Sequence, residues 1–162
     1  SGSAPVERGD LIRHTLTVTE LCMKAAETIE REYKIPINKD NLIAGALLHD
    51  IMKIYEWKIG KGGAEHTGIM LDHSLLGVAE LYHRGFPEGV IHIVASHYGE
   101  QGPTSPRNFE ALILHHIDTL VSLTEYHFYG AMKSAKEIPQ LLLLDEETIK
   151  KLIGEKTEKK SE

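Results

Sequence analysis

The segment from Gly45 to Trp57, GALLHDIMKIYEW, carries three ionisable side chains in otherwise apolar surroundings. His49, Asp50 and Lys53 lie three or four positions from Ala46 or from one another, so a helix places them on one face. An imidazole and a carboxylate in an apolar environment are costly unless something satisfies them. A divalent metal does so, because neutral imidazole and ionised carboxylate are both good ligands. A surface pair of Asp50 with Lys53 beside a core histidine is the alternative interpretation.

Further histidines and one aspartate lie on or beside the apolar faces of other predicted helices. Taken singly, each has an ordinary explanation, such as helix capping for His73, a helix-dipole contact for His97 or a solvated carboxylate for Asp118. Because they form one ordered series, we interpret them together as a metal cluster. The candidate ligands in chain order are His14, His49, Asp50, His73, His97 and Asp118.

Two more histidines are reserve candidates. His115 precedes Asp118 by three positions, so it is a reserve ligand or a hydrogen-bond donor to the ligands. His92 is weaker, because it shares a polar face with Glu88 and Ser96.

Glycine and proline separate a series of helical patterns, without sustained alternation of period two. Helices are expected over residues 11–33, 38–57, 73–84, 87–97 and 108–130, with a further amphipathic helix capped near Asp145. Asn38 or Asp40 and Asp72 are candidate N-caps, and the glycine-rich segment 58–71 is a loop without a Walker motif. We predict an all-α bundle of six to seven helices: one domain over residues 4–144, then a C-terminal helix and charged tail over 145–162.

Composition limits the partners and the location. A length of 162 residues suits a single domain, and the net charge of -6 makes a long nucleic acid an unexpected partner. The single cysteine, Cys22, excludes an intramolecular disulfide and suits a cytoplasmic location. No apolar run approaches the ~20 residues of a membrane span, so no membrane association is expected.

The ordered series resembles the HD-domain superfamily of metal-dependent phosphohydrolases. AGALLHDIMK is similar to the family's central motif LLHDIGK, with Met52 where glycine is common. RHTLTVTELC, LDHSLLG, IVASHYGE and EALILHHIDTLVS resemble the other ligand segments, so the resemblance runs from His14 to about Leu123. The last two segments resemble most closely the HD domain of bacterial 3′–5′ exoribonucleases, and compact archaeal cyclic phosphodiesterases are a second comparison.

The resemblance implies how the candidate ligands divide between metals. The first metal would be held by His14, His49, Asp50 and Asp118, and a second by His73 and His97, with Asp50 as a bridge. Tyr98 stands where many relatives have another histidine. The expected cofactor is one or two divalent transition-metal ions, of iron, manganese, nickel, cobalt or zinc.

The resemblance implies a metal-dependent phosphodiesterase that hydrolyses a small, nucleotide-like phosphoester. Cyclic phosphoesters are included in this substrate class. A metal-activated water would attack phosphorus in line at Asp50, and Lys53 would neutralise a phosphoryl oxygen. Arg107 and Ser105 are further candidate phosphate contacts, although a solvated loop residue is the alternative for Arg107. The exoribonucleases carry an additional nucleic-acid-binding domain that we do not find in the sequence, which favours a small substrate.

Other functions stay open. A 5′-nucleotidase-type phosphomonoesterase and an exoribonuclease-like activity use the same kind of site. A catalytically silent, metal-sensing helical module is the non-enzymatic alternative. The ligand set contains only histidine and aspartate and has more than four members, which favours an open, reactive site over a structural one. The sequence leaves the oligomeric state open.

Overall fold

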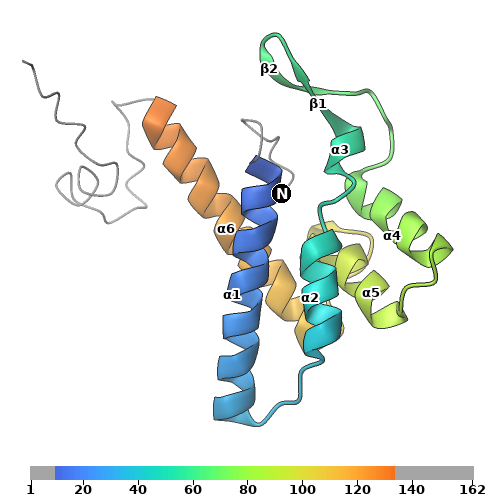
Figure 1. Ribbon diagram of the computed structural model, residues 1–162, viewed down its shortest axis with the longest axis vertical. Coiled ribbons are helices and arrows are strands. Elements are labelled where there is room, and N and C mark those ends of the chain that lie inside the picture. The colour runs from blue at the N-terminus through green and yellow to red at the C-terminus, as the bar shows by residue number, and fades with distance from the viewer. Residues whose placement is uncertain (1–9, 134–162) are drawn as a thin grey trace, which may run out of the picture. The chain divides into compact units, whose positions relative to one another are not determined.

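The structure is a computed structural model that describes the backbone of residues 10–133 and the side chains of residues 10–128. The elements are α1 (Asp10–Tyr33), α2 (Lys39–Leu48), α3 (Lys53–Glu56), β1 (Trp57–Gly60), β2 (Gly63–His66), α4 (His73–His83), α5 (Glu88–Ser96), the 3₁₀ turn η1 (Gly99–Gln101) and α6 (Phe109–Lys133) (Figure 1). Residues up to Tyr126 form one compact unit, which contains every element except the end of α6. The predicted all-α fold is confirmed as a mainly helical one, with the addition of a two-stranded hairpin, while the helix predicted near Asp145 lies outside the described residues.

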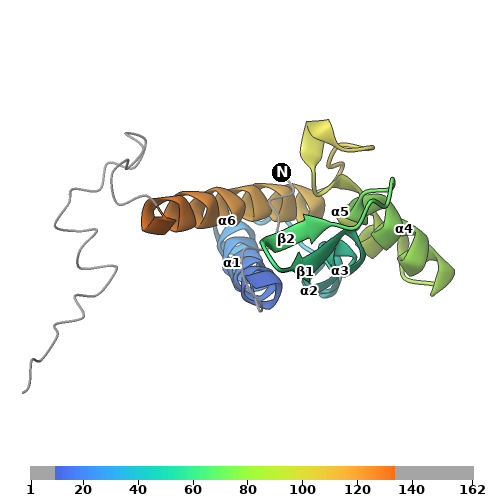
Figure 2. The same cartoon turned by 90° about the horizontal axis from the view of Figure 1, so that it is seen from above.

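The helices pack against one another in an ordered series. α1 packs against α2, α2 against α5, and α5 against α4. Figures 1 and 2 show α6 crossing α1 at an angle, and the hairpin β1–β2 extending from the end of α3. None of the helices within residues 10–133 is long and apolar enough to cross a membrane.

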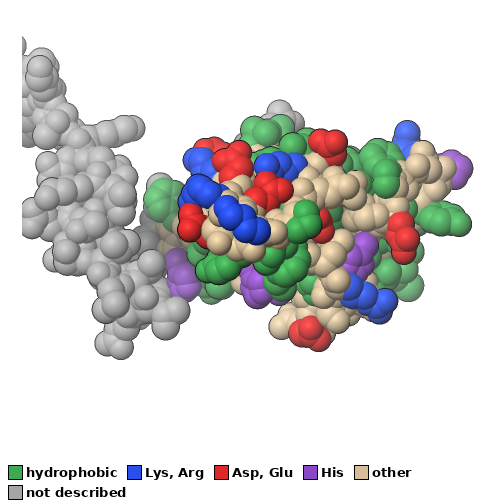
Figure 3. All heavy atoms as spheres, turned by 90° about the horizontal axis from the view of Figure 1, so that it is seen from below, with side chains coloured by type: hydrophobic (Ala, Val, Ile, Leu, Met, Phe, Trp, Pro, Cys, Tyr) green, Lys and Arg blue, Asp and Glu red, His purple; other side chains and the backbone are tan. Residues whose placement is uncertain are grey.

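α1 is amphipathic, and its two faces have different surroundings. Figure 3 shows side chains of both charges gathered over the end of α1 and the start of α2. In this region Glu30 pairs with Lys39 at 2.5 Å and Arg31 with Glu32 at 2.7 Å. The opposite face carries a stripe of buried residues at intervals of four: His14, Val18, Cys22 and Ala26. The stripe that buries α1 therefore also buries His14.

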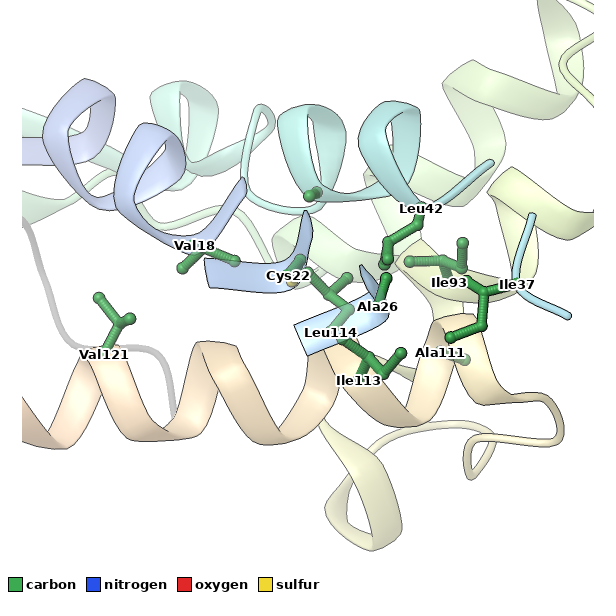
Figure 4. Packing of buried hydrophobic residues seen from close by; sticks show 11 residues of the cluster. Val18, Cys22, Ala26, Ile37, Leu42, Ile93, Ala111, Ile113, Leu114 and Val121 are labelled. Carbon is green, nitrogen blue, oxygen red and sulfur yellow. The ribbon is translucent and has the colours of Figure 1, made fainter. Parts of the chain in front are cut away.

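The hydrophobic core lies between α1, α2, α5 and α6. Val18, Cys22 and Ala26 of α1 meet residues from the other three helices (Figure 4). These residues are Leu42 and Ala46 of α2, Ile93 of α5, and Ala111, Ile113, Leu114 and Val121 of α6. Asp118 lies between Leu114 and Val121 in α6, so the same helix face that fills the core also carries the aspartate.

The prediction of one helix over residues 38–57 is wrong. α2 ends at Leu48, and tight turns follow in which Ile51 N bonds to Leu48 O and Lys53 N to Asp50 O. His49 Nδ1 also donates to Ala46 O at 2.8 Å, so a side chain satisfies a carbonyl in the last turn of α2. The break turns both His49 and Asp50 toward the interior, where they are 0% and 1% exposed.

The segment predicted as a loop over residues 58–71 contains part of a hairpin instead. β1 and β2 pair antiparallel, with Trp57 opposite His66 and Gly60 opposite Gly63. Gly63 has φ of 115°, which favours glycine at the turn. Strands of four residues rich in glycine give almost no alternation pattern, and this explains why the sequence did not reveal them.

Two of the predicted caps are confirmed. Asn38 Oδ1 accepts from Asn41 N at the start of α2, whereas Asp40 lies in the first turn of that helix. Asp72 Oδ1 accepts from Leu75 N at 3.0 Å and begins α4, so His73 becomes the first residue of that helix. The Asp72 cap thus determines where α4 begins, and with it the position of the buried His73.

Gly45 allows α2 and α5 to approach closely. A Cβ added there would lie 2.4 Å from Ile93 Cγ2 and 2.8 Å from Ile93 Cβ. Ile93 is fully buried and its Cβ belongs to a helix, so it has little room to move. The approach brings the turn after α2 near the end of α5, where His97 follows.

Gly45→Ala is predicted to destabilise the protein, although alanine is the better helix former. The clash with Ile93 should cost about 1–3 kcal/mol, the usual range for overpacking a core. Urea unfolding followed by circular dichroism measures the change. Gly62→Ala is the control, because nothing lies within 4 Å of its added Cβ. A Gly45→Ala protein as stable as the parent would contradict the close approach.

Candidate metal centre

The six candidate ligands come together in the interior from five parts of the chain. They lie on α1, on the turn after α2, at the start of α4, just after α5 and on α6. Each is at most 8% exposed, and His49 and His73 are fully buried. The residues brought together are His14, His49, Asp50, His73, His97 and Asp118.

Asp50 lies at the middle of this cluster, with each carboxylate oxygen facing two imidazoles. Its Oδ2 is 3.6 Å from His14 Nε2 and 3.5 Å from His49 Nε2. Its Oδ1 is 3.1 Å from His73 Nε2 and 3.9 Å from His97 Nε2. Two groups of possible ligands therefore share one aspartate: the first group is His14, His49 and Asp50, and the second group is Asp50, His73 and His97.

Asp118 adds a second carboxylate beside the first group. Its Oδ1 lies 3.0 Å from His14 Nε2 and 3.7 Å from His49 Nε2. Ser122, one turn further along α6, donates its hydroxyl to the same oxygen at 3.2 Å. The first group with Asp118 therefore offers two imidazoles and two carboxylates.

Backbone hydrogen bonds determine which nitrogen two of the histidines present. His49 Nδ1 donates to Ala46 O at 2.8 Å, and His97 Nδ1 donates to Val94 O at 2.7 Å. A carbonyl only accepts, so in the neutral imidazole the other nitrogen, Nε2, has a free lone pair. Both Nε2 atoms are buried without a hydrogen-bond partner among the described residues. Unsatisfied buried acceptors are costly, and a divalent cation between these side chains would satisfy them.

Carboxylates support the other two histidines. His14 Nδ1 donates to Glu125 Oε2 at 2.9 Å, and His73 Nδ1 donates to Glu56 Oε2 at 2.5 Å. A carboxylate behind a metal-binding imidazole orients the ring and makes its other nitrogen more basic. All four imidazoles thus direct Nε2 toward Asp50 and Asp118.

Sequence reasoning missed both glutamates. Glu125 follows Asp118 by seven residues, two turns along the same face of α6, so helical spacing was a usable signal. Glu56 offered no such signal, because residues 45–57 were interpreted as one continuous helix. The break after Leu48 is what brings Glu56 to His73.

The electrostatics keep the carboxylates ionised. Burial alone would raise the pKa of Asp50, but His49, Lys53 and His73 hold it well below its usual range. Burial acts in the same direction on Asp118, but the hydrogen bond from His14 and the proximity of His49 hold its pKa low. Both aspartates are therefore in the form that binds a cation.

The imidazoles differ from one another in charge. Burial, together with the nearby charge of His49, lowers the pKa of His97 to about 4, so this ring is neutral at pH 7. Burial also lowers the pKa of His14, but its hydrogen bonds to Asp118 and Glu125 outweigh this effect and raise it to about 9. His14 must therefore release a proton before it can bind a metal through Nε2.

Lys53 belongs to the cluster as well. Its Nζ donates to Asp50 Oδ2 at 2.7 Å, and the residue is 8% exposed. The alternative interpretation of Asp50 and Lys53 as a surface pair is therefore wrong about the surface, because the pair exists but is buried.

The remaining predicted residues lie outside the two groups. His115 Nδ1 donates to His97 O at 2.8 Å, so it supports the backbone of a candidate ligand. His92 Nε2 accepts a hydrogen bond from the backbone N–H of the exposed Arg107 at 3.0 Å, so this nitrogen is already engaged. His92 belongs to neither group of possible ligands. Ser105 is half-buried in the same loop as Arg107, and phosphate binding by either residue stays a prediction.

Comparison with known proteins identifies the family of this chain. The HD domain matches residues 11–123. The dihydroneopterin 2′,3′-cyclic phosphate phosphodiesterase of Methanocaldococcus jannaschii is 49% identical over 112 residues, which is 68% of this chain and 45% of that protein. The 3′-5′ exoribonuclease YhaM of a Geobacillus strain is 37% identical over 97 residues, which is 52% of this chain and 30% of that protein.

The chain thus spans less than half the length of these two curated relatives. No solved structure gave a significant match. The HD match covers well over half of the 162 residues and includes all six candidate ligands. The chain therefore belongs to the HD-domain family.

Proposed function

We propose that this protein is a metal-dependent phosphodiesterase that hydrolyses a small, cyclic phosphoester. The observation that carries the proposal is the position of Asp50, whose two oxygens face two separate groups of imidazoles. A carboxylate shared in this way suits a pair of cations, the arrangement that many phosphoester hydrolases use to clamp a phosphoryl group.

The residues fit divalent transition metals such as iron, manganese, nickel, cobalt or zinc. A first cation would be held by His14, His49, Asp50 and Asp118, and a second by Asp50, His73 and His97. Bound cations supply Lewis acidity, which neutralises phosphoryl charge and makes a water molecule acidic enough to attack near neutral pH.

The chain's own charged side chains suit the candidate site to this chemistry. Lys53 Nζ lies 2.7 Å from Asp50 Oδ2, so an oxygen of a phosphoryl group held at Asp50 comes within reach of the ammonium. A compact positive charge there offsets the negative charge that develops on the non-bridging oxygens. Glu56 and Glu125 keep His73 and His14 directed at the same centre.

Both relatives support the proposed substrate class. Each is named for the cleavage of a phosphodiester, in one case a 2′,3′-cyclic phosphate and in the other RNA. The net charge of -6, and the mixed charges over the end of α1 in Figure 3, disfavour a long polyanion on this chain. A small cyclic diester is therefore favoured over RNA and over a phosphomonoester.

The proposed activity is tested with protein reconstituted with each metal in turn. We expect hydrolysis of bis-p-nitrophenyl phosphate and of a 2′,3′-cyclic nucleotide, with at most weak hydrolysis of p-nitrophenyl phosphate. A preference for the monoester would favour a phosphomonoesterase. Absence of hydrolysis with every metal would contradict the enzymatic proposal.

His49→Ala and Asp50→Asn should each abolish this hydrolysis. Each removes a ligand, so the loss should exceed the roughly 10–100-fold that supporting residues of metal sites cost. His83→Ala is the matched control, because His83 is exposed at the end of α4. Undiminished turnover in His49→Ala or Asp50→Asn would refute the assignment of the site.

Glu125→Ala should weaken metal binding without unfolding the protein. His14 then loses the carboxylate that orients its ring, and affinity for the first cation should fall about 10–100-fold. Isothermal titration calorimetry of metal-free protein measures the affinity. Glu20→Ala, on the exposed face of α1, serves as the control. Equal affinities in the two variants would show that Glu125 has no supporting role.

A further inference from the structure

Thr67 joins the end of the hairpin β1–β2 to the end of α3, from which the hairpin extends in Figure 1. Its backbone N–H donates to Glu56 O at 2.9 Å. Its hydroxyl donates to Tyr55 O at 2.7 Å and also lies 3.2 Å from Glu56 O. The last carbonyls of a helix lack partners within it, so Thr67 completes the C-terminal end of α3.

The register of the hairpin places Thr67 at this position. Trp57 pairs with His66, so the next pair outward brings Thr67 opposite Glu56. The rings of Trp57 and His66 meet edge to face, with a centroid distance of 5.3 Å. Directly afterwards Gly68 has φ of 90°, and its N–H donates to His66 Nδ1 at 3.0 Å. The chain thus turns away after Thr67, which closes the base of the hairpin.

Glu56 connects this closure to the second group. Its Oε2 accepts a hydrogen bond from His73 Nδ1 at 2.5 Å. The other nitrogen of that ring, Nε2, lies 3.1 Å from Asp50 Oδ1. Hydrogen bonds therefore lead from Thr67 through Glu56 to the imidazole that faces Asp50.

Neither α3 nor the hairpin is expected to hold Glu56 in place by itself. α3 has four residues, whereas isolated helices shorter than about 12 residues are marginal in water. A single two-stranded hairpin is marginal as well. The two elements therefore depend on each other, and the bonds of Thr67 are where they meet.

We propose that Thr67 is a positioning residue for the second group. By closing the hairpin onto the end of α3 it holds Glu56 against His73, and so fixes the direction of His73 Nε2. The inference rests on the two-cation site of the proposed function, but it does not depend on the substrate.

The first group has separate supports. His14 is oriented by Glu125, and His49 by the carbonyl oxygen of Ala46. A change at Thr67 should therefore weaken a cation in the second group and leave a cation in the first group unaffected.

Cobalt titration of metal-free protein, followed by calorimetry, tests the proposal. Thr67→Val removes the hydroxyl and keeps the shape of the side chain. The second ion should then bind about 3–10-fold more weakly, the effect of one lost hydrogen bond, while the first binds unchanged. Thr67→Ser keeps the hydroxyl and should restore the affinity. Thr28→Val is the control, because its hydroxyl donates to a backbone carbonyl, Lys24 O, on the exposed side of α1.

A double-mutant cycle shows whether Thr67 acts through Glu56. Glu56→Ala should by itself weaken the second ion about 10–100-fold, as expected for a residue that supports a metal ligand. Adding Thr67→Val to Glu56→Ala should weaken it no further, because the interaction that Thr67 supports is already lost.

A second readout needs no metal. In metal-free protein with isotope-labelled histidine, NMR shows which ring nitrogen of His73 carries the proton. We expect the proton on Nδ1 in the wild type, in Thr67→Ser and in Thr28→Val. In Thr67→Val we expect a mixture of the Nδ1 and Nε2 forms, because Glu56 is no longer held against the ring.

The outcomes separate this proposal from the proposed function. Wild-type affinity for the second ion in Thr67→Val, equal weakening of both ions, or a further loss in the double variant would each overturn the role of Thr67. Fewer than two ions in the wild type would overturn the two-cation site, and the proton position on His73 would then decide the role of Thr67. Two ions bound as expected, without phosphodiesterase activity, would support Thr67 and count against the proposed function alone.

Discussion

Burial of the Asp50 carboxylate is the main energetic constraint on this fold. A carboxylate that is 1% exposed is costly unless cationic groups and hydrogen-bond donors surround it. Lys53 and His73 contact its oxygens at 2.7 Å and 3.1 Å, and the other three imidazoles lie between 3.5 Å and 3.9 Å away. All four candidate imidazoles thus lie within 3.9 Å of an Asp50 oxygen.

The fold meets this constraint with elements that also form the core. The buried stripe of α1 continues from Val18 to His14, and the face of α6 that carries Leu114 also carries Asp118. Gly45 lets α2 pack closely on α5, which leads to His97. Core packing and ligand placement therefore depend on the same helix faces. Substitutions that move these helices should also disturb the cluster.

Much of the cluster was predictable because its members are in phase with apolar stripes. His14 and Asp118 were recognised in this way, and His73 follows a cap that the sequence also indicates. The supporting interactions were less accessible. Glu56 reaches His73 only because α2 breaks after Leu48, and no periodic pattern marks that break. The hairpin β1–β2 is too short and too rich in glycine to produce an alternation. The proposed substrate class rests on the relatives, since a histidine–aspartate cluster serves many phosphoesters.

We propose that Asp50 bridges two cations. Anomalous diffraction from crystals soaked in Mn²⁺ tests this bridge, because each ion is located independently of activity. We expect two anomalous peaks, one within coordination distance of Asp50 Oδ2 and His14, the other within coordination distance of Asp50 Oδ1 and His73. A single peak, or two peaks that do not share Asp50, would show that Asp50 does not bridge two cations.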